Sequence, residues 1–138
     1  MTKSSLLQSI SSIKQNKLKG RETALKRGET MKTVYISGKM TGLEQSVYER
    51  NFQQAELFYR ACGYEVVNPC NLSAIVLKRN PDATYEDFMK EDLKALAGCS
   101  HIAMLEGWET SPGARRERNE AKRLGLTIVY LRILGGEK

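Results

Sequence analysis

From Thr33 onward, short β-rich runs alternate with segments of helical periodicity, and this alternation restricts the chain to few folds. The runs are TVYIS, YEVVNP, HIAML and LTIVYL, at residues 33–37, 64–69, 101–105 and 126–131. Strands separated by helices pack as a parallel sheet, because the connecting helices return the chain across its faces. We therefore predict an α/β fold. It would be a three-layer sandwich with a mostly parallel, Rossmann- or flavodoxin-like sheet of four to five strands.

The first helix is predicted from its two ends. Ser46 and Glu49 have the spacing of a capping box, which predicts a helix that begins there. Gly63 is predicted to stop it. Its inner face is expected to carry Tyr48, Phe52, Ala55, Tyr59 and Cys62.

The middle of the chain has weaker signals. Pro69 is expected to close the second strand, and residues 72–77 are expected to form a short helix. Thr84 and Asp87 form a second capping box, which predicts a helix to about Ala97.

Glu117 occupies an unusual place in the stretch SPGARRERNEA. Ser111 can cap a helix there, and Pro112 suits its first turn. At about 100° per residue, Glu117 falls on the same face as Ala121 and Leu124, the face that the helix is expected to bury. A buried carboxylate is costly unless it is paired or hydrogen-bonded.

Asp92 repeats this arrangement on the preceding helix. It lies one turn from Phe88 and one turn from Leu96, within an apolar face that also contains Tyr85 and Met89. Two such acids on helices that flank strand 101–105 suggest a shared cleft and paired carboxylate chemistry at a glycosidic bond. A structural explanation stays open. Glu117 could pair with Arg118 or another arginine, and Asp92 could accept backbone amides at a helix start.

Two loops have the character of anion sites. At the helix start, free amides, the Ser111 hydroxyl and the bare backbone of Gly113 suit a phosphate, although ordinary capping explains the same residues. The loop SGKMTG (37–42) contains two glycines, two hydroxyls and Lys39, but it matches no dinucleotide or Walker motif.

Charge and cysteine content exclude several classes of protein. The net charge is +6, but residues 1–30 carry seven Lys/Arg and two Glu, whereas the remaining residues are nearly neutral. We predict a basic, flexible extension over 1–30 and one domain over 31–138. Nucleic-acid binding is expected only through that extension.

Three scattered cysteines and a single histidine give no metal site, and no apolar run is long enough for a membrane span. These features predict a cytoplasmic protein.

Several motifs together resemble nucleoside 2-deoxyribosyltransferase-like proteins. The run G-A-x-x-E-x-x-x-A, from Gly113 to Ala121, is similar to the helix that carries their nucleophilic glutamate. YISGKMTG is similar to their opening strand and glycine turn, and Asp92 precedes the third strand at a similar spacing. The phrase LEGWETSPGARRE looks like an uncharacterised branch of the superfamily. The resemblance covers nearly all of 32–131.

The resemblance implies a function. Glu117 would be the nucleophile at C1′ of a (deoxy)ribosyl group, and Asp92 would protonate the leaving base or orient the sugar. Tyr35 and the loop Ser37, Gly38, Lys39 and Met40 would line the sugar and base pocket. Ser111, Gly113 and Ala114 would bind a phosphate, and Trp108 would either stack on a base or cover the core. The resemblance implies no metal or cofactor. It does imply a homo-oligomer.

The departures from the family pattern shape the prediction. Ser111 stands where the transferases favour an acid. This uncharged serine favours a nucleoside 5′-monophosphate as substrate, with water as acceptor. An acid is also missing at Ser100, and a glycine at Asn119. We therefore predict an N-glycosidase or deoxyribosyltransferase-like enzyme for a nucleotide or nucleoside. The alternative is a non-catalytic nucleotide sensor or sequestering protein on the same fold.

Overall fold

The structure, a computed structural model, describes residues 32–132. The predicted N-terminal extension lies outside the described residues, and the division at residue 30 stays a prediction. The elements, in chain order, are β1 (Thr33–Ser37), α2 (Gln45–Ala61), β2 (Glu65–Val67), α3 (Pro69–Arg79), α4 (Tyr85–Ala97), β3 (His101–Leu105), the 3-10 turn η1 (Trp108–Thr110), α5 (Pro112–Leu124) and β4 (Thr127–Leu131).

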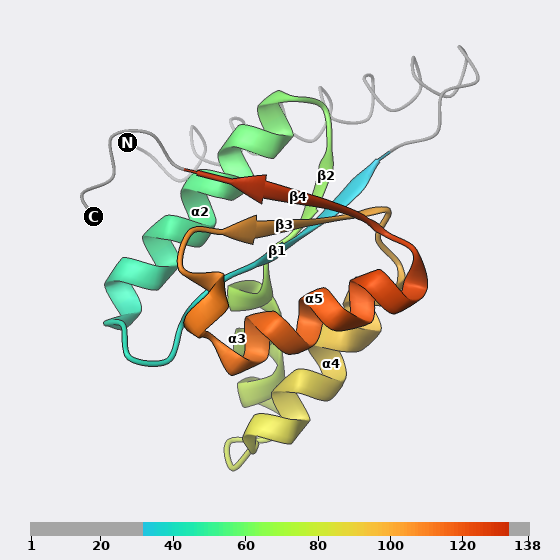
Figure 1. The fold of residues 1–138 in the computed structure, drawn as a ribbon. Coiled ribbons are helices and arrows are strands. Elements are labelled where there is room, and N and C mark those ends of the chain that lie inside the picture. The colour runs from blue at the N-terminus through green and yellow to red at the C-terminus, as the bar shows by residue number, and fades with distance from the viewer. Residues whose placement is uncertain (1–31, 133–138) are drawn as a thin grey trace, which may run out of the picture. The chain divides into compact units, whose positions relative to one another are not determined.

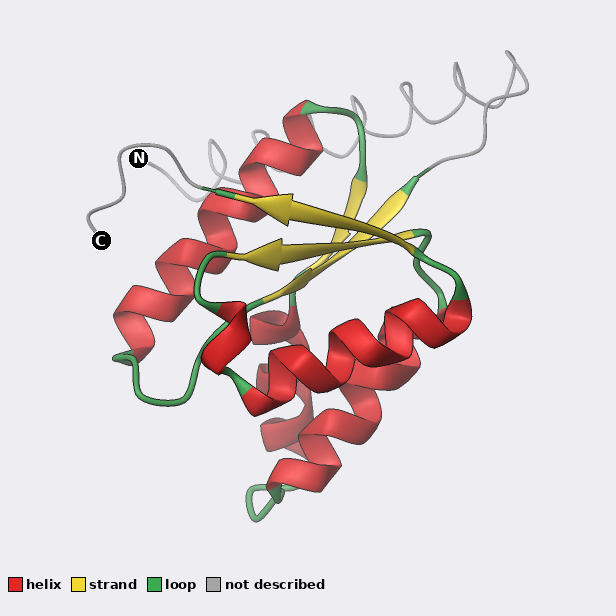
Figure 2. Ribbon diagram, in the orientation of Figure 1, coloured by secondary structure: helices red, strands yellow, loops and turns green. Residues whose placement is uncertain are grey.

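Within residues 32–132, four parallel strands form one sheet in the order β2-β1-β3-β4. The register pairs Tyr35 with Val67 on one side and with Ile102 on the other. Because all strands run the same way, the loops that follow β1 and β3 leave the sheet at the same edge (Figure 2). The predicted α/β class and parallel sheet are therefore confirmed, with four strands.

The two faces of the sheet carry separate helices (Figure 1). Val34 and Ile36 point to the face covered by α2, where they join clusters that contain Phe52, Ala55 and Tyr59. The opposite face is covered by α4 and α5, and its cluster contains Tyr35, Leu96, Ile102, Met104, Ala114 and Ala121. This alternation along β1 turns every second side chain toward α5.

The helix ends agree with the sequence in two places. Thr84 and Asp87 form the predicted capping box, with the Thr84 Oγ1 accepting from the Asp87 amide at 3.3 Å. Gly63 follows α2 with φ of +90°, a left-handed backbone that favours glycine.

The predicted start of α2 is wrong. The helix begins at Gln45, with Glu44 in the extended N-cap conformation and no side-chain cap. Ser46 therefore lies inside the first turn. Glu49, the expected reciprocal partner, instead accepts from Gln45 Nε2 at 2.8 Å. Cys62 is exposed at the end of α2 and does not join its inner face.

Pro69 opens a helix and does not close a strand. Asn68 caps α3 by accepting from the Cys70 amide at 3.0 Å, and Pro69 occupies the first turn, where its fixed φ suits a helix. These two signals extend α3 well beyond the short helix predicted over 72–77. None of the helices within residues 32–132 has the length and apolar character needed to cross a membrane.

Candidate active site

Glu117 lies on the buried face of α5, against β1. Ser111 caps this helix, and Pro112 is in its first turn, as predicted. The small side chains of Ala114 and Ala121 are 1% and 0% exposed, so α5 packs closely on the sheet. Glu117, between them, is 5% exposed. The sequence prediction of a carboxyl on the buried face of this helix is confirmed.

Two hydroxyl groups from β1 bind the Glu117 carboxyl. Tyr35 donates through its phenolic OH to Oε2, and Ser37 Oγ donates to Oε1 at 2.7 Å. Tyr35 and Ser37 are two positions apart on one strand, so their side chains share a face. In the described part of the chain no lysine or arginine pairs with Glu117. The arginine partner proposed as the structural explanation is therefore wrong for residues 32–132.

The pKa of Glu117 reflects opposing effects. Burial is the largest effect and raises the pKa, the hydrogen bonds from Tyr35 and Ser37 lower it, and the negative charge of Asp92 raises it. The net result is a pKa of about 7, above the usual 4.5. Burial and the charge of Glu117 likewise hold the pKa of Tyr35 well above its ordinary value, which keeps the phenol a proton donor.

Asp92 is the second carboxyl near this site. It is half-buried in the middle of α4. No hydrogen bond or ion pair acts on its pKa within residues 32–132, so the backbone-amide explanation is also wrong. Burial and the charge of Glu91 raise its pKa to about 7. Its charge acts on both Tyr35 and Glu117. Two carboxyls with raised pKa values therefore share one environment, a pattern common at functional sites.

The first turn of α5 lies beside the first turns of α4. Ser111 is buried, and its Oγ accepts from the Ala114 amide at 3.2 Å. The hydroxyl proton of Ser111 and the amide of Gly113 are left as possible donors to a ligand. Pro112, between them, has no N–H to donate. A Cβ placed on Gly113 would lie 3.4 Å from the Tyr85 hydroxyl and 3.8 Å from Met89 Sδ. The absence of a side chain at Gly113 thus leaves room at the helix start.

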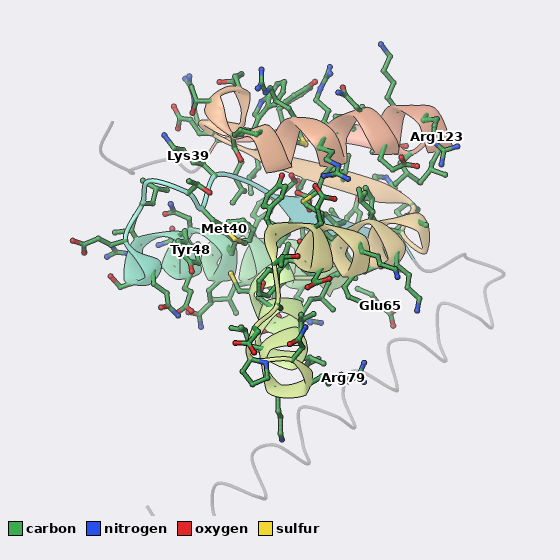
Figure 3. All side chains as sticks on the ribbon, turned by 90° about the horizontal axis from the view of Figure 1, so that it is seen from below. Lys39, Met40, Tyr48, Glu65, Arg79 and Arg123 are labelled. Atoms are coloured by element: carbon green, nitrogen blue, oxygen red, sulfur yellow. The ribbon has the colours of Figure 1, made fainter. Side chains whose placement is uncertain are left out.

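The loop after β1 forms another side of the candidate site. Gly38 follows Ser37, and a Cβ there would lie 3.0 Å from Leu105 Cβ, so the ends of β1 and β3 require a glycine. Figure 3 shows Lys39, Met40 and Tyr48 near the start of α2. Met40 and Tyr48 pack against one cluster. The structure thus brings Tyr35 and Ser37 to the carboxyl, whereas Met40 packs toward the α2 side.

Trp108 belongs to η1, which follows β3, and it lies against the hydrophobic core. It packs against the cluster beneath α5, and its ring centroid is 5.9 Å from that of Tyr130. The Arg118 guanidinium lies over the Trp108 ring at 5.0 Å, and Arg118 Nε donates to the Tyr130 OH at 3.0 Å. These contacts agree with an aromatic cover over the core. Base stacking by Trp108 stays a prediction.

Tyr85 is a candidate residue of the active site that the sequence interpretation did not identify. It was assigned to the apolar face of α4, but it is 53% exposed and its hydroxyl lies near Gly113. The signal was its spacing, because Tyr85 is seven residues before Asp92 and so lies on the same helical stripe. In the described residues, no group of three or more His, Cys, Asp or Glu side chains could hold a metal ion.

Comparison with known proteins places most of the described chain in one family. Residues 32–130 match the family described as "Domain of unknown function (DUF4406)". The chain belongs to this family. The matched region of this DUF4406 protein contains both carboxyls and the loops around them. No curated protein matches the sequence.

A solved structure has the same fold. The CMP N-glycosidase BcmB of Clostridium botulinum is similar to this DUF4406 chain with a TM-score of 0.50 and 20% sequence identity. The similarity covers 75% of this chain and 71% of that chain. This likeness shows a shared fold, and the family match is consistent with the uncharacterised branch that the sequence motifs indicated.

Proposed function

We propose that this protein is an N-glycosidase that cleaves the bond between the base and the sugar of a nucleoside 5′-monophosphate or nucleoside. The observation that carries the proposal is the Glu117 carboxyl, which is buried, free of any cation within residues 32–132 and held by two hydroxyl donors. The unpartnered carboxyl of Asp92 acts on it electrostatically. The fold shared with a CMP N-glycosidase supports a nucleotide substrate.

The hydrogen bonds indicate which carboxyl carries the proton. Donors favour the charged form of the group that accepts them, and Tyr35 and Ser37 donate only to Glu117. Asp92 has no such donors. Both carboxyls have a pKa of about 7, so the two donors are what favour the charge on Glu117 and leave the proton on Asp92. We infer that Glu117 is the anionic nucleophile and that Asp92 is the general acid.

The reaction then proceeds in two displacements at C1′. A Glu117 oxygen forms a bond to C1′ while the bond from C1′ to the base nitrogen breaks, and Asp92 donates its proton to the departing nitrogen. Water next attacks C1′, gives its proton to the Asp92 carboxylate, and releases Glu117. The products are the free base and the sugar phosphate. A second base in place of water would give transfer instead of hydrolysis.

The start of α5 supports a 5′-phosphate on the substrate. The Ser111 hydroxyl and the Gly113 amide lie at the N-terminus of α5, the positive end of the helix dipole, where an anion is favoured. Ser111 also carries no charge that would repel a phosphate. Lys39 and Arg115 are the cations closest in sequence to the two loops, and we propose them as additional phosphate contacts. A homo-oligomer remains part of the proposal.

A product assay tests the proposed function. The protein is incubated with ribo- and deoxyribonucleotides and nucleosides, with and without a free acceptor base, and base release or exchange is followed by chromatography. Glu117→Gln should abolish release. Glu120→Gln is the matched control, because Glu120 lies one turn further along α5 and pairs with Arg123. Release that is unchanged in Glu117→Gln would show that the proposal is wrong.

A non-catalytic nucleotide-binding role is the second candidate. It is favoured by the 5% exposure of Glu117 and by the engagement of both its oxygens, which restrict the approach of a substrate. This role predicts that nucleotides raise the melting temperature without any product. Base release by the wild-type protein would contradict it.

A further inference from the structure

The contact between Ser37 and Glu117 joins two side chains that are almost completely buried. Ser37 is 0% exposed and Glu117 is 5% exposed, and the Ser37 Oγ lies 2.7 Å from Glu117 Oε1. The resemblance to transferases implied that Ser37 lines the substrate pocket. That placement stays a prediction, and the structure adds that the Ser37 hydroxyl donates its proton to the Glu117 carboxyl.

The position of Ser37 is fixed by its surroundings. It is the last residue of β1 and pairs with Met104 of β3 in the sheet register. Gly38 follows it and packs so closely on Leu105 that a Cβ would lie 3.0 Å from Leu105 Cβ. The backbone that carries the Ser37 hydroxyl therefore has little freedom to move.

A glutamate carboxyl needs two donors to be fixed in orientation. Rotation about its last bond is broad and nearly twofold, so one donor on one oxygen leaves the plane free to turn. Tyr35 binds Oε2 and Ser37 binds Oε1, so the two contacts together fix the plane. Each oxygen still has a second lone pair available for attack.

We propose that Ser37 is a positioning residue that, together with Tyr35, fixes the plane of the Glu117 carboxyl for attack at C1′. The kinetic part of this proposal rests on the proposed function, whereas the contact itself does not. Removal of Ser37 Oγ would leave a carboxyl that is held by Tyr35 alone and is free to rotate. Since Ser37 acts through Glu117, its loss should lower kcat and leave KM unchanged.

Titration of Glu117 tests the contact without any need for activity. The protein is labelled with ¹³C at the glutamate carboxyls, and Glu117→Gln identifies the Glu117 signal. Ser37→Ala removes a donor to the charged form and should raise the pKa of Glu117. Tyr35→Phe should move the same signal in the same direction. The charged and titratable groups that act on Glu117 from the packed elements are Tyr35 on β1 and Asp92 on α4.

Ser100→Ala is the matched control. Ser100 bonds to Thr33 at the opposite edge of the same sheet, so its loss removes a hydroxyl without touching Glu117. Thermal unfolding of each variant identifies any loss of folding. A Glu117 titration that moves in Tyr35→Phe but not in Ser37→Ala would overturn the proposal.

Kinetics then separate the two proposals. On the substrate found by the product assay, Ser37→Ala should lower kcat about ten- to a hundred-fold at constant KM. An increase in KM with an unchanged titration would mean that Ser37 contacts substrate, which overturns the positioning role. If the wild-type protein releases no base but the titration moves in Ser37→Ala, the contact stands and the proposed function fails.

Discussion

Tyr35 on β1 donates a hydrogen bond to Glu117 on α5, although the two residues are 82 positions apart in the sequence. The bond connects the central strand of the sheet to the helix that covers it. Neither partner carries a positive charge, so the cost of burying the Glu117 charge is offset only by neutral donors. Ionisation of Glu117 should therefore oppose folding.

The first prediction concerns stability against pH. Glu117 has a pKa of about 7 in the folded protein, raised from 4.5. Between these values the folded state holds a proton that the unfolded chain has released, so the free energy of unfolding should fall as pH rises from about 4.5 to about 7. Asp92, raised from 3.8 to about 7, acts in the same direction.

Glu117→Gln should remove about half of this slope, because Asp92 has a pKa shift of similar size and keeps its own contribution. The expected difference between pH 5 and pH 8 is on the order of 3 kcal/mol for Glu117. Urea unfolding at the two pH values measures it. Glu120→Gln should keep the wild-type slope, because Glu120 is ion-paired with Arg123 near the surface. A Glu117→Gln protein with an unchanged slope would contradict the prediction.

The second prediction concerns the approach of β1 to β3. Gly38→Ala would place a Cβ 3.0 Å from Leu105 Cβ, and we expect a loss of about 1–3 kcal/mol in the free energy of unfolding. Gly98→Ala is the control, because its Cβ would meet only the Ala95 carbonyl at 3.6 Å. We expect a change within about 0.5 kcal/mol there. Equal losses in both variants would argue against a specific close approach at Gly38.

Much of the fold could be predicted because its signals are local. The strand runs alternate with helices, and the capping box at Thr84 needs only its own turn. Prediction failed where two signals competed. Pro69 reads as a strand end, yet after Asn68 it starts a helix. Ser46 has the capping spacing, but the chain enters α2 one residue earlier, at Gln45.

The site could be predicted only in part, for a related reason. The periodicity of each helix placed Glu117 and Asp92 on the buried side. The partners of Glu117 lie on β1, and strand pairing and helix packing decide which side chains meet. The sequence therefore assigned Tyr35 and Ser37 to the substrate pocket, which stays a prediction, and did not show that both donate to Glu117. Tyr85 was missed because an aromatic at an apolar spacing resembles a core residue.

The third prediction uses the single tryptophan of the chain. Trp108 lies under the Arg118 guanidinium and beside Tyr130. Arg118→Ala removes the cation and the hydrogen bond to Tyr130, so we expect a change in tryptophan fluorescence and a loss of about 0.5–1 kcal/mol of stability. Nucleotides should leave the fluorescence of the wild-type protein unchanged. Quenching by a nucleotide would instead support base stacking on Trp108.

The last prediction separates capping from anion binding at the start of α5. Ser111→Ala removes the cap of α5, and Thr84→Ala removes the cap of α4. Each should cost about 1 kcal/mol in the free energy of unfolding, measured by urea denaturation. Only Ser111→Ala also removes a hydroxyl donor beside Gly113, so it alone should weaken the affinity for nucleoside 5′-monophosphates, measured by calorimetry. Its affinity for the corresponding nucleosides should be unchanged, because they have no phosphate. Equal affinities of the two variants for the monophosphates would limit Ser111 to capping and move the phosphate contact away from this helix.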